Sequence, residues 1–314
     1  MAKEIRAAVA GVGYLGRFHA QKYAALPDCT LTGVLDASPA RCKEVADEIG
    51  VTAFENLDQL LENVDAVSVA VTTSAHFEVA SKCLEAGKHV LIEKPIAPTV
   101  GEAEKLVDLA NKNKVILQVG FLERFNPAFQ NCHQRINQPQ FIEAIRIASF
   151  VERGADVDVV LDLMSHDLDL VLALARSPVK ELHAVGKSLM TDSTDLANAR
   201  IIFEDGCVAN ITASRISNKV ERKLRVFQHN SYFSLDFAEP SVRFLERVAE
   251  GQTLDAFSGE RVKLDKADAL LAEIDSFLQA VRGDAPPAVS GEDGLRGMRV
   301  AEQVMADIAK NQLP

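Results

Sequence analysis

Three polar side chains recur at helical spacing in the stretch V-L-D-L-M-S-H-D-L-D-L-V, residues 160–171. Asp162, His166 and Asp169 stand at positions i, i+4 and i+7, which places them on one face of a helix. Histidine exchanges a proton near neutral pH, and a carboxylate one turn away can orient the imidazole or accept a hydrogen bond from a substrate hydroxyl. The pattern indicates general acid–base chemistry. The structural alternative for His166 is a buried histidine satisfied by its acidic neighbours.

A lysine occupies a second position where chemistry is expected. Lys94 lies in Glu93-Lys94-Pro95, directly after the apolar run Val90–Ile92. In a parallel sheet the carboxyl ends of the strands bind ligands, and Pro95 restrains the backbone of Lys94. Such a lysine can transfer a proton or polarise an oxygen atom. On position alone, a surface lysine that merely follows a strand is an equal alternative.

A glycine-rich turn follows the apolar run Ile5–Ala10. Gly11, Gly13 and Gly16 fit G-x-G-x-x-G, and a helical pattern starts at once. In this motif the first glycine allows the tight turn, the second allows close approach of a pyrophosphate, and the third allows helix–sheet packing. The phosphates then bind at a helix N-terminus. The cofactor contacts predicted for this turn are Gly11, Gly13, Tyr14, Leu15 and Gly16.

An acidic residue closes the next apolar run, T-L-T-G-V-L-D. Asp36 follows Gly16 by 36 − 16 = 20 residues, the spacing at which a ribose-binding acid falls. A carboxylate there binds the ribose hydroxyls and repels a 2′-phosphate, so NAD is favoured over NADP. Ala37 offers no contact to such a phosphate, although Arg41 is near enough in sequence to reach one.

The composition limits the partners. The chain has 314 residues, a length typical of two domains, with 47% hydrophobic residues and a net charge of −11. A nucleic acid or an acidic membrane requires a basic face, so we expect neither as a partner. No apolar run approaches the length of a transmembrane helix.

The cysteines and the N-terminus indicate a cytoplasmic protein. The five cysteines form no C-x-x-C pair, so neither a zinc site nor a disulfide framework is expected, and reduced thiols fit the cytoplasm. The sequence M-A-K-E-I-R leads directly into a strand pattern without the apolar region of a signal peptide.

The first part of the chain, residues 1–120, alternates strand and helix patterns and is predicted to be a doubly wound parallel sheet, an NAD(P)-binding Rossmann domain. The strands expected there are Ile5–Ala10, Leu31–Leu35, Ala66–Ala70, Val90–Ile92 and Val115–Val119. The helices expected between them are Gly16–Ala25, Pro39–Ile49, Leu57–Glu62, His76–Ala86 and Val100–Asn111.

The remainder, residues 121–314, is predicted to be an α/β domain for substrate binding and oligomerisation, with a large, open, mostly antiparallel sheet. The expected strands are Glu143–Val151, Lys180–Lys187, Asp195–Phe203, Cys207–Ser214, Lys223–Gln228, Tyr232–Asp236 and Ser241–Glu246. The expected helices are Val160–Ala175, Ala267–Arg282 and Gly294–Lys310. A sheet with one uncovered face predicts a homodimer or homotetramer through that face.

These motifs together resemble the Gfo/Idh/MocA oxidoreductase family. The glycine turn, Glu93-Lys94-Pro95, the D-x-x-x-H-x-x-D pattern and P-P-A-V-S-G-E-D-G at 286–294 occur in the family's order over nearly the whole chain. The resemblance implies NAD(P)-dependent oxidation or reduction of a hydroxyl on a sugar, cyclitol or similar polyol. It also implies that Lys94 and His166 form the acid–base pair and that Asp162 assists substrate binding. With such a pair present, no metal is expected.

Further positions match the family. The segment T-T-S-A-H resembles a cofactor-side stretch, which makes Thr72, Thr73 and His76 cofactor candidates; Glu93 and Lys94 join them. Arg124 and Asn126 resemble residues that meet the substrate, beside Lys94, Asp162 and His166; their alternative is a structural crossover turn. The chain departs from the family at Thr73, where proline is common, and at Met164, where many relatives carry glycine.

A narrower resemblance concerns the substrate. V-L-D-L-M-S-H-D-L-D together with F-E-D-G-C-V-A-N-I-T-A-S-R is similar to a subgroup that oxidises the 3-hydroxyl of UDP-N-acetylglucosamine for lipid A diamino-sugar synthesis. A diphosphate needs cations, and the candidates are Arg124, Arg146, Arg215 and Arg222. The alternatives are an inositol or aldose dehydrogenase, a redox-neutral NAD enzyme, and a non-catalytic NAD(H)-sensing protein.

Overall fold

Packing divides the protein into two compact units. The computed structural model describes residues 4–151, 157–250 and 256–311. Unit 1 contains the described residues up to Leu122 together with Asp268–Arg296, and unit 2 contains Glu123–Ala267 and the described residues from Gly297 onward. The units differ from the expected domains 1–120 and 121–314, because a C-terminal helix buries Ile274, Phe277 and Leu278 in the core of unit 1.

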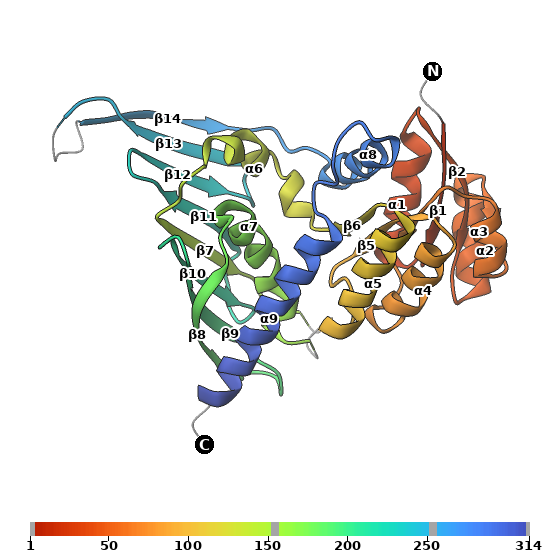
Figure 1. Ribbon diagram of the computed structural model, residues 1–314, viewed down its shortest axis with the longest axis horizontal. Coiled ribbons are helices and arrows are strands. Elements are labelled where there is room, and N and C mark those ends of the chain that lie inside the picture. The colour runs from red at the N-terminus through yellow and green to blue at the C-terminus, as the bar shows by residue number, and fades with distance from the viewer. Residues whose placement is uncertain (1–3, 152–156, 251–255, 312–314) are drawn as a thin grey trace. The chain divides into compact units, whose positions relative to one another are not determined.

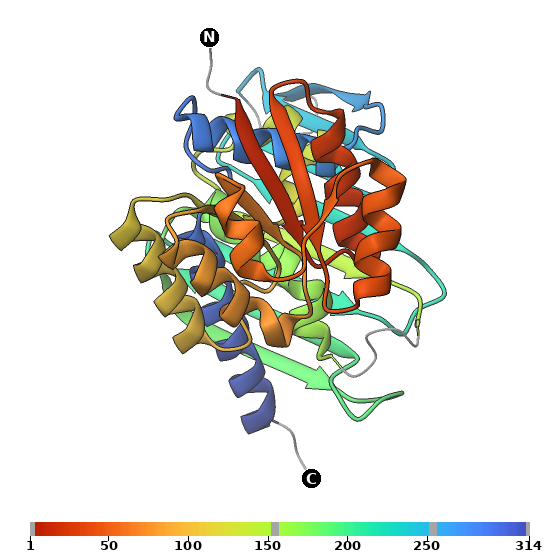
Figure 2. The same cartoon turned by 90° about the vertical axis from the view of Figure 1, so that its right-hand side faces the viewer.

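Unit 1 is built on a six-stranded sheet in which every pairing is parallel. The strand order is β3-β2-β1-β4-β5-β6, the doubly wound order of dinucleotide-binding folds. Figure 2 shows the first strands of this sheet in red, with helices of the same unit beside them. Its strands are β1 (Ile5–Ala10), β2 (Cys29–Leu35), β3 (Thr52–Ala53), β4 (Ala66–Val69), β5 (His89–Glu93) and β6 (Leu117–Gly120). The predicted parallel sheet is confirmed, and its ligand crevice is expected where the order reverses, between β1 and β4.

Local sequence signals set the helix ends in unit 1. The helices are α1 (Tyr14–Ala25), α2 (Pro39–Ile49), α3 (Leu57–Glu62), α4 (Thr73–Glu85), α5 (Val100–Asn113) and α8 (Ala269–Arg282). Ser38 caps α2, Pro39 occupies its first turn, and Gly50 ends it with φ +81°. The Thr99 side chain accepts from the Glu102 N–H at the start of α5. These caps fix the ends of the loops that carry Asp36 and Lys94, two of the cofactor candidates.

Unit 2 is built on an eight-stranded sheet of order β14-β13-β12-β11-β7-β10-β9-β8 (Figure 1). Neighbouring strands are antiparallel except β7 and β10, which run parallel. The strands are β7 (Phe141–Ile147), β8 (Val179–Lys187), β9 (Leu196–Phe203), β10 (Val208–Ser214), β11 (Glu221–Phe227), β12 (Ser231–Asp236), β13 (Ser241–Arg247) and β14 (Phe257–Lys263). The mostly antiparallel sheet is confirmed.

Helices cover one face of this sheet (Figure 1). The helical elements are η1 (Leu122–Phe125), α6 (Pro127–Cys132), η2 (His133–Arg135), η3 (Val160–Met164), α7 (Ser165–Ala175) and α9 (Gly291–Asn311). Alternate sheet residues such as Ile211 and Leu224 pack with Leu168 of α7 and Val304 of α9 in one core. The helix α7 is thereby packed against the sheet.

Candidate functional site

The glycine turn joins β1 to α1 with little free space. Gly11 adopts φ +86°, and a Cβ there would lie 2.6 Å from Ala70 O. A Cβ on Gly16 would overlap the Gly11 carbonyl oxygen, because α1 packs directly on the turn. Gly13 differs: among the described residues no atom lies within 4 Å of the place its Cβ would take. The turn is closely packed on the protein side and open toward solvent at Gly13.

The open side of this turn is suited to an anion. Gly13 is the residue before the first turn of α1, no described side chain caps that turn, and it contains no acidic residue. The free N–H groups and the helix dipole favour negative charge there. Tyr14 and Leu15 begin the helix, and Tyr14 is 67% exposed. The residues fit a dinucleotide diphosphate.

Asp36 lies beside this turn at the end of β2. Its two carboxylate oxygens accept hydrogen bonds from Val12 N–H at 2.8 Å and from Ser38 N–H at 2.9 Å. Arg41 donates from Nε to the Val12 carbonyl at 2.8 Å and pairs with Glu44 at 2.9 Å. The carboxylate is therefore oriented by the backbone of both loops, while Arg41 is directed to a carbonyl and a carboxylate rather than toward a phosphate.

The start of α4 brings two further candidates to the carboxyl end of β4. Thr72 and Thr73 are exposed there, whereas His76 is buried, 1% exposed. The His76 ring nitrogens lie 2.7 Å from Pro95 O and 3.2 Å from Val71 O. Burial lowers the pKa of His76. His76 thus connects the α4 loop to the Lys94-Pro95 turn, a positioning arrangement that the sequence did not indicate.

Glu93 ends β5 and Lys94 directly follows it; both are half-buried. The Glu93 carboxylate pairs with Nε2 of His19, a residue of α1, at 2.9 Å. A second buried acid, Glu273 of α8, lies close to both. Sequence reasoning missed His19 and Glu273.

In unit 2 a π-helical turn carries Asp162. The Asp158 carboxylate accepts from Val160 N–H at 2.8 Å where η3 begins, and Val160 and Met164 are fully buried. Asp162 and His166, four residues apart across this turn, are half-buried. Met164, which replaces the family's glycine, packs into the core of unit 2. Such turns inside helices frequently mark functional positions.

Asp169, on α7, is held by an arginine. Arg124 donates to its two carboxylate oxygens at 2.6 and 2.9 Å, and the Asp169 side chain is 2% exposed. Asn126 caps α6 by accepting from Ala128 N–H and donates to Glu123 and to the Phe237 carbonyl. Both segments are therefore structurally engaged, which favours the crossover-turn alternative for Arg124 and Asn126; their substrate contacts stay a prediction.

Two of the arginines considered for a diphosphate are buried in ion pairs. Arg146 pairs with Asp167 at 2.9 Å and with Glu123 at 2.8 Å, and Arg215 pairs with Asp195 at 2.8 Å. Their side chains are only 4% and 5% exposed. Arg222 lies 3.9 Å from Glu123 with 46% of its side chain exposed. Arg222 is the most exposed arginine of this set, since the side chain of Arg124 is only 13% exposed.

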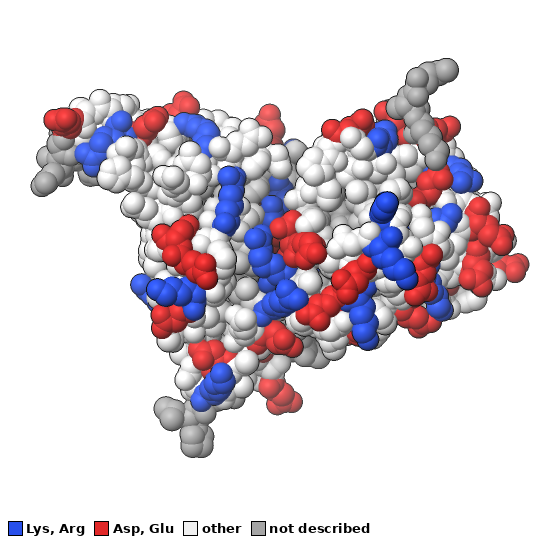
Figure 3. Space-filling model, in the orientation of Figure 1, with Lys and Arg blue, Asp and Glu red and all other residues white. Residues whose placement is uncertain are grey.

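Both signs of charge are interspersed over the face drawn in Figure 3. That face does not present the single basic surface that a nucleic acid binds. Among the described residues, no helix combines the length and hydropathy needed to cross a bilayer.

Comparisons with known proteins agree with the fold and the motifs. Residues 5–121 match the model of the Gfo/Idh/MocA oxidoreductase family, NAD-binding Rossmann fold, and residues 132–231 match the Gfo/Idh/MocA C-terminal domain. The chain is 41% identical over 304 residues to UDP-N-acetylglucosamine 3-dehydrogenase of Acidithiobacillus ferrooxidans, covering 96% of each chain. A solved structure of that enzyme, GnnA, superposes with a TM-score of 0.91 at 40% identity over 98% of both chains.

A more distant relative acts on a cyclitol. The myo-inositol 2-dehydrogenase of Thermotoga maritima is 28% identical over 92% of each chain. The candidates for chemistry come from both units, Lys94 from the first and Asp162 and His166 from the second. With these matches, its fold and its glycine turn, the chain belongs to the Gfo/Idh/MocA family of oxidoreductases, and its first unit is the family's NAD-binding Rossmann fold.

Proposed function

We propose that this protein oxidises the 3-hydroxyl of UDP-N-acetylglucosamine with NAD, giving the 3-keto sugar nucleotide, NADH and a proton. The observation that carries the proposal is the 41% identity to a UDP-N-acetylglucosamine 3-dehydrogenase over 96% of the chain. An inositol dehydrogenase is the competing assignment, supported by a lower identity of 28%.

The residues of unit 1 fit the cofactor. The N-terminus of α1 at Gly13 receives the diphosphate, Asp36 the ribose hydroxyls, and Thr72 and Thr73 line the same edge of the sheet. Bound NAD supplies the carbon that accepts a hydride. The protein's task is then to hold the substrate and to manage the hydroxyl proton.

We assign the acid–base roles as the family resemblance implies them. His166 removes the hydroxyl proton, Lys94 donates a hydrogen bond to the oxygen as the carbonyl forms, and Asp162 orients His166 or binds a neighbouring hydroxyl. Arg222, accessible beside Glu123, is the cation we assign to the sugar nucleotide's diphosphate.

The test is a substrate panel with NAD. UDP-N-acetylglucosamine, UDP-glucose, myo-inositol and glucose are compared by NADH formation, with a glutamate-dependent aminotransferase removing the keto product. We expect UDP-N-acetylglucosamine to exceed UDP-glucose in kcat/KM by on the order of 100-fold, because a site built around the acetamido group leaves polar atoms unpaired with the analogue.

Other outcomes assign the alternatives. Turnover of myo-inositol alone identifies a cyclitol dehydrogenase. Conversion of a substrate without net NADH identifies a redox-neutral enzyme. NAD binding by calorimetry with no turnover of any substrate identifies an NAD(H)-sensing protein.

Asp36→Asn is expected to relax cofactor choice. The amide keeps one acceptor for the backbone but removes the charge that repels a 2′-phosphate. The preference for NADH over NADPH, measured as a ratio of Kd values by fluorescence titration, is expected to fall by about 10- to 100-fold.

The matched control is Glu44→Gln. Glu44 is another acidic residue near this turn; it pairs with Arg41, is 65% exposed and lies outside the ribose position. It should leave the ratio unchanged; an equal ratio in Asp36→Asn and the unmodified protein would show that Asp36 does not select the cofactor.

We further propose an interface through which the protein forms oligomers and a compartment in which it acts. The face of the eight-stranded sheet opposite α7 and α9 carries partly or fully exposed polar residues, among them Arg200, Asn210 and Arg225. We assign this face to a homodimer or homotetramer. The five cysteines are buried free thiols, as suits a reducing compartment, and we place the reaction in the cytoplasm.

A further inference from the structure

Glu273 is a carboxyl group in an apolar setting. It lies on α8 on the same side as Leu270, Ile274 and Phe277, and it is fully buried. Neither carboxylate oxygen has a hydrogen-bond partner among the described residues. An ionised carboxylate in such a place is very unfavourable, so either a proton or a cation must neutralise it.

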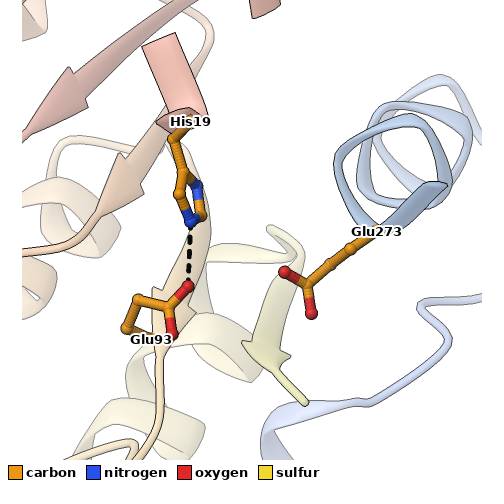
Figure 4. A group of neighbouring side chains, drawn as sticks. All are labelled: His19, Glu93 and Glu273. Atoms are coloured by element: carbon orange, nitrogen blue, oxygen red, sulfur yellow. Dashed lines mark hydrogen bonds and ion pairs between the residues drawn. The ribbon is translucent and has the colours of Figure 1, made fainter. Parts of the chain in front are cut away.

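Two titratable groups, Glu93 and His19, lie against Glu273, and the buried Tyr23 hydroxyl of α1 also interacts with its charge. One oxygen of Glu273, one oxygen of Glu93 and one ring nitrogen of His19 all lie within 4.8 Å of one another. Figure 4 shows the Glu273 side chain extending from α8 toward Glu93, which in turn points to His19. The neighbouring strand β6 contributes Gln118, a neutral amide that donates to the Glu273 backbone carbonyl at 3.2 Å.

A chain of hydrogen bonds connects Tyr23 to Glu93 through Ser68 and His19. Tyr23 OH lies 2.9 Å from Ser68 Oγ, which lies 3.2 Å from His19 Nδ1, and Nε2 lies 2.9 Å from Glu93. Burial raises the pKa of Tyr23, so its hydroxyl keeps its proton and is able to donate to Ser68. With Tyr23 donating, Ser68 donates to Nδ1, and the ring hydrogen then lies on Nε2, directed at Glu93.

This arrangement favours a proton over a cation at Glu273. A metal ion would need the Nε2 lone pair of His19, whereas the 2.9 Å contact of Nε2 with a carboxylate oxygen of Glu93 requires a hydrogen between the two atoms. Burial, together with the charge of Glu93, raises the pKa of Glu273 well above its ordinary value. Two carboxylates this close do not both ionise readily in a buried site.

We propose that Glu273 keeps its proton in the folded protein and thereby lets an ionised Glu93, paired with His19, hold the following residue, Lys94, in its working position. Loss of the Glu273 proton places a second negative charge against Glu93. The repulsion weakens the Glu93–His19 contact at the end of β5 and displaces Lys94. Glu273 is a positioning residue in this scheme, and the inference rests on the proposed role of Lys94.

The first test measures the proton directly and needs no activity. The infrared spectrum of the unmodified protein at about pH 7 should contain the C=O band of a protonated, buried carboxyl, and Glu273→Gln should lack it. Asp275→Asn is the matched control, because Asp275 lies on the same helix and bonds to Gln279 outside the cluster. It should keep the band.

The second test measures how thermal stability depends on pH. The folded pKa is raised, so between the unfolded and folded pKa values the native state binds more protons, and stability falls as the pH rises. The Tm of the unmodified protein and of Asp275→Asn should therefore fall more steeply from about pH 5 to 9 than that of Glu273→Gln. Parallel slopes, absence of the infrared band, or a stoichiometric metal that Glu273→Gln loses would each overturn the proposal.

Turnover tests the positioning step. The ratio of kcat between Glu273→Gln and the unmodified protein should rise about threefold or more from neutral to alkaline pH, with KM for NAD nearly unchanged, since only the unmodified protein can lose the proton. A constant ratio, with the infrared band present, would leave Glu273 protonated but without influence on Lys94 and would overturn the positioning role. Inactivity of all variants, the unmodified protein included, would instead contradict the proposed function.

Discussion

His166→Ala and Lys94→Ala are each expected to lower kcat by about 10²- to 10⁴-fold, the range for loss of a general acid or base. Neither side chain forms the diphosphate or ribose contacts, so the Kd for NADH should change by less than about threefold. Turnover of the preferred substrate and fluorescence titration with NADH measure the two quantities separately. A loss confined to kcat identifies groups that act in the transition state.

Surface residues of the same types provide the controls. Lys82 pairs with Glu78 on α4 with 53% of its side chain exposed, and His183 pairs with Glu181 on β8 with 64% exposed. Lys82→Ala and His183→Ala should keep full turnover. If His166→Ala and Lys94→Ala lose NADH affinity as strongly as turnover, both residues serve cofactor binding and the acid–base assignment is wrong.

The first unit could be predicted closely because its signals are local. β1 and helices α2 and α3 have the expected bounds, and the other shared elements differ by one to three residues at their ends. Buried parallel strands give continuous apolar runs, and caps such as Ser38 mark helix starts. The exception is α8: its apolar face shows that it is buried but not against which core, so its packing with unit 1 could not be read from the sequence.

The second unit was predicted in type but not in detail. β14 was missed because its strand, F-S-G-E-R-V-K, is largely exposed and has little apolar alternation. The parallel pairing of β7 with β10 was also missed, since the strands are distant in sequence and periodicity does not report pairing partners. The pairing of edge strands and the strand register depend on tertiary contacts, which a short window of sequence does not contain.

The sequence predicts the residue types of the candidate site but not all the contacts that hold them. Helical spacing predicts that Asp169 shares a face with Asp162 and His166; Arg124 also donates two hydrogen bonds to the Asp169 carboxylate, a contact the sequence did not indicate. A π-helical turn in place of regular helix changes which residues share a face, and Asp162 lies in it. The sequence could not show this, because a π turn has no distinct residue pattern.

The sequence signal that was overlooked is a titratable residue at a core-facing position of a helix. Glu273 interrupts the apolar face of α8 between Leu270 and Phe277, and a charged residue at such a position is rare without a partner or a proton. His19 similarly lies on the buried side of α1, with Ala20 and Tyr23. Reading core-facing positions for charged residues would have found both members of the cluster, though not their proximity to Glu93.

Two glycine substitutions separate folding from cofactor binding and have the largest expected effects on unit 1. Gly16→Ala forces a Cβ onto the Gly11 carbonyl, a backbone atom that cannot move without shifting the whole turn. Stability is expected to fall by about 3 kcal/mol or more. NADH binding is expected to be lost with it, because the turn and the N-terminus of α1 move together.

Gly13→Ala is the matched variant, for which we expect a loss of NADH affinity with little loss of stability. Its Cβ meets no described atom within 4 Å, and its φ of −62° lies outside the left-handed region, so Tm should fall far less than in Gly16→Ala. The new methyl group instead occupies the open side of the turn, where the diphosphate must approach the backbone, and NADH affinity should fall by about 30- to 100-fold. Calorimetric unfolding and NADH titration of both variants give the comparison. Equal affinity in Gly13→Ala and the unmodified protein would place the diphosphate away from this turn, whereas a stable Gly16→Ala that still binds NADH would show that α1 tolerates displacement from β1.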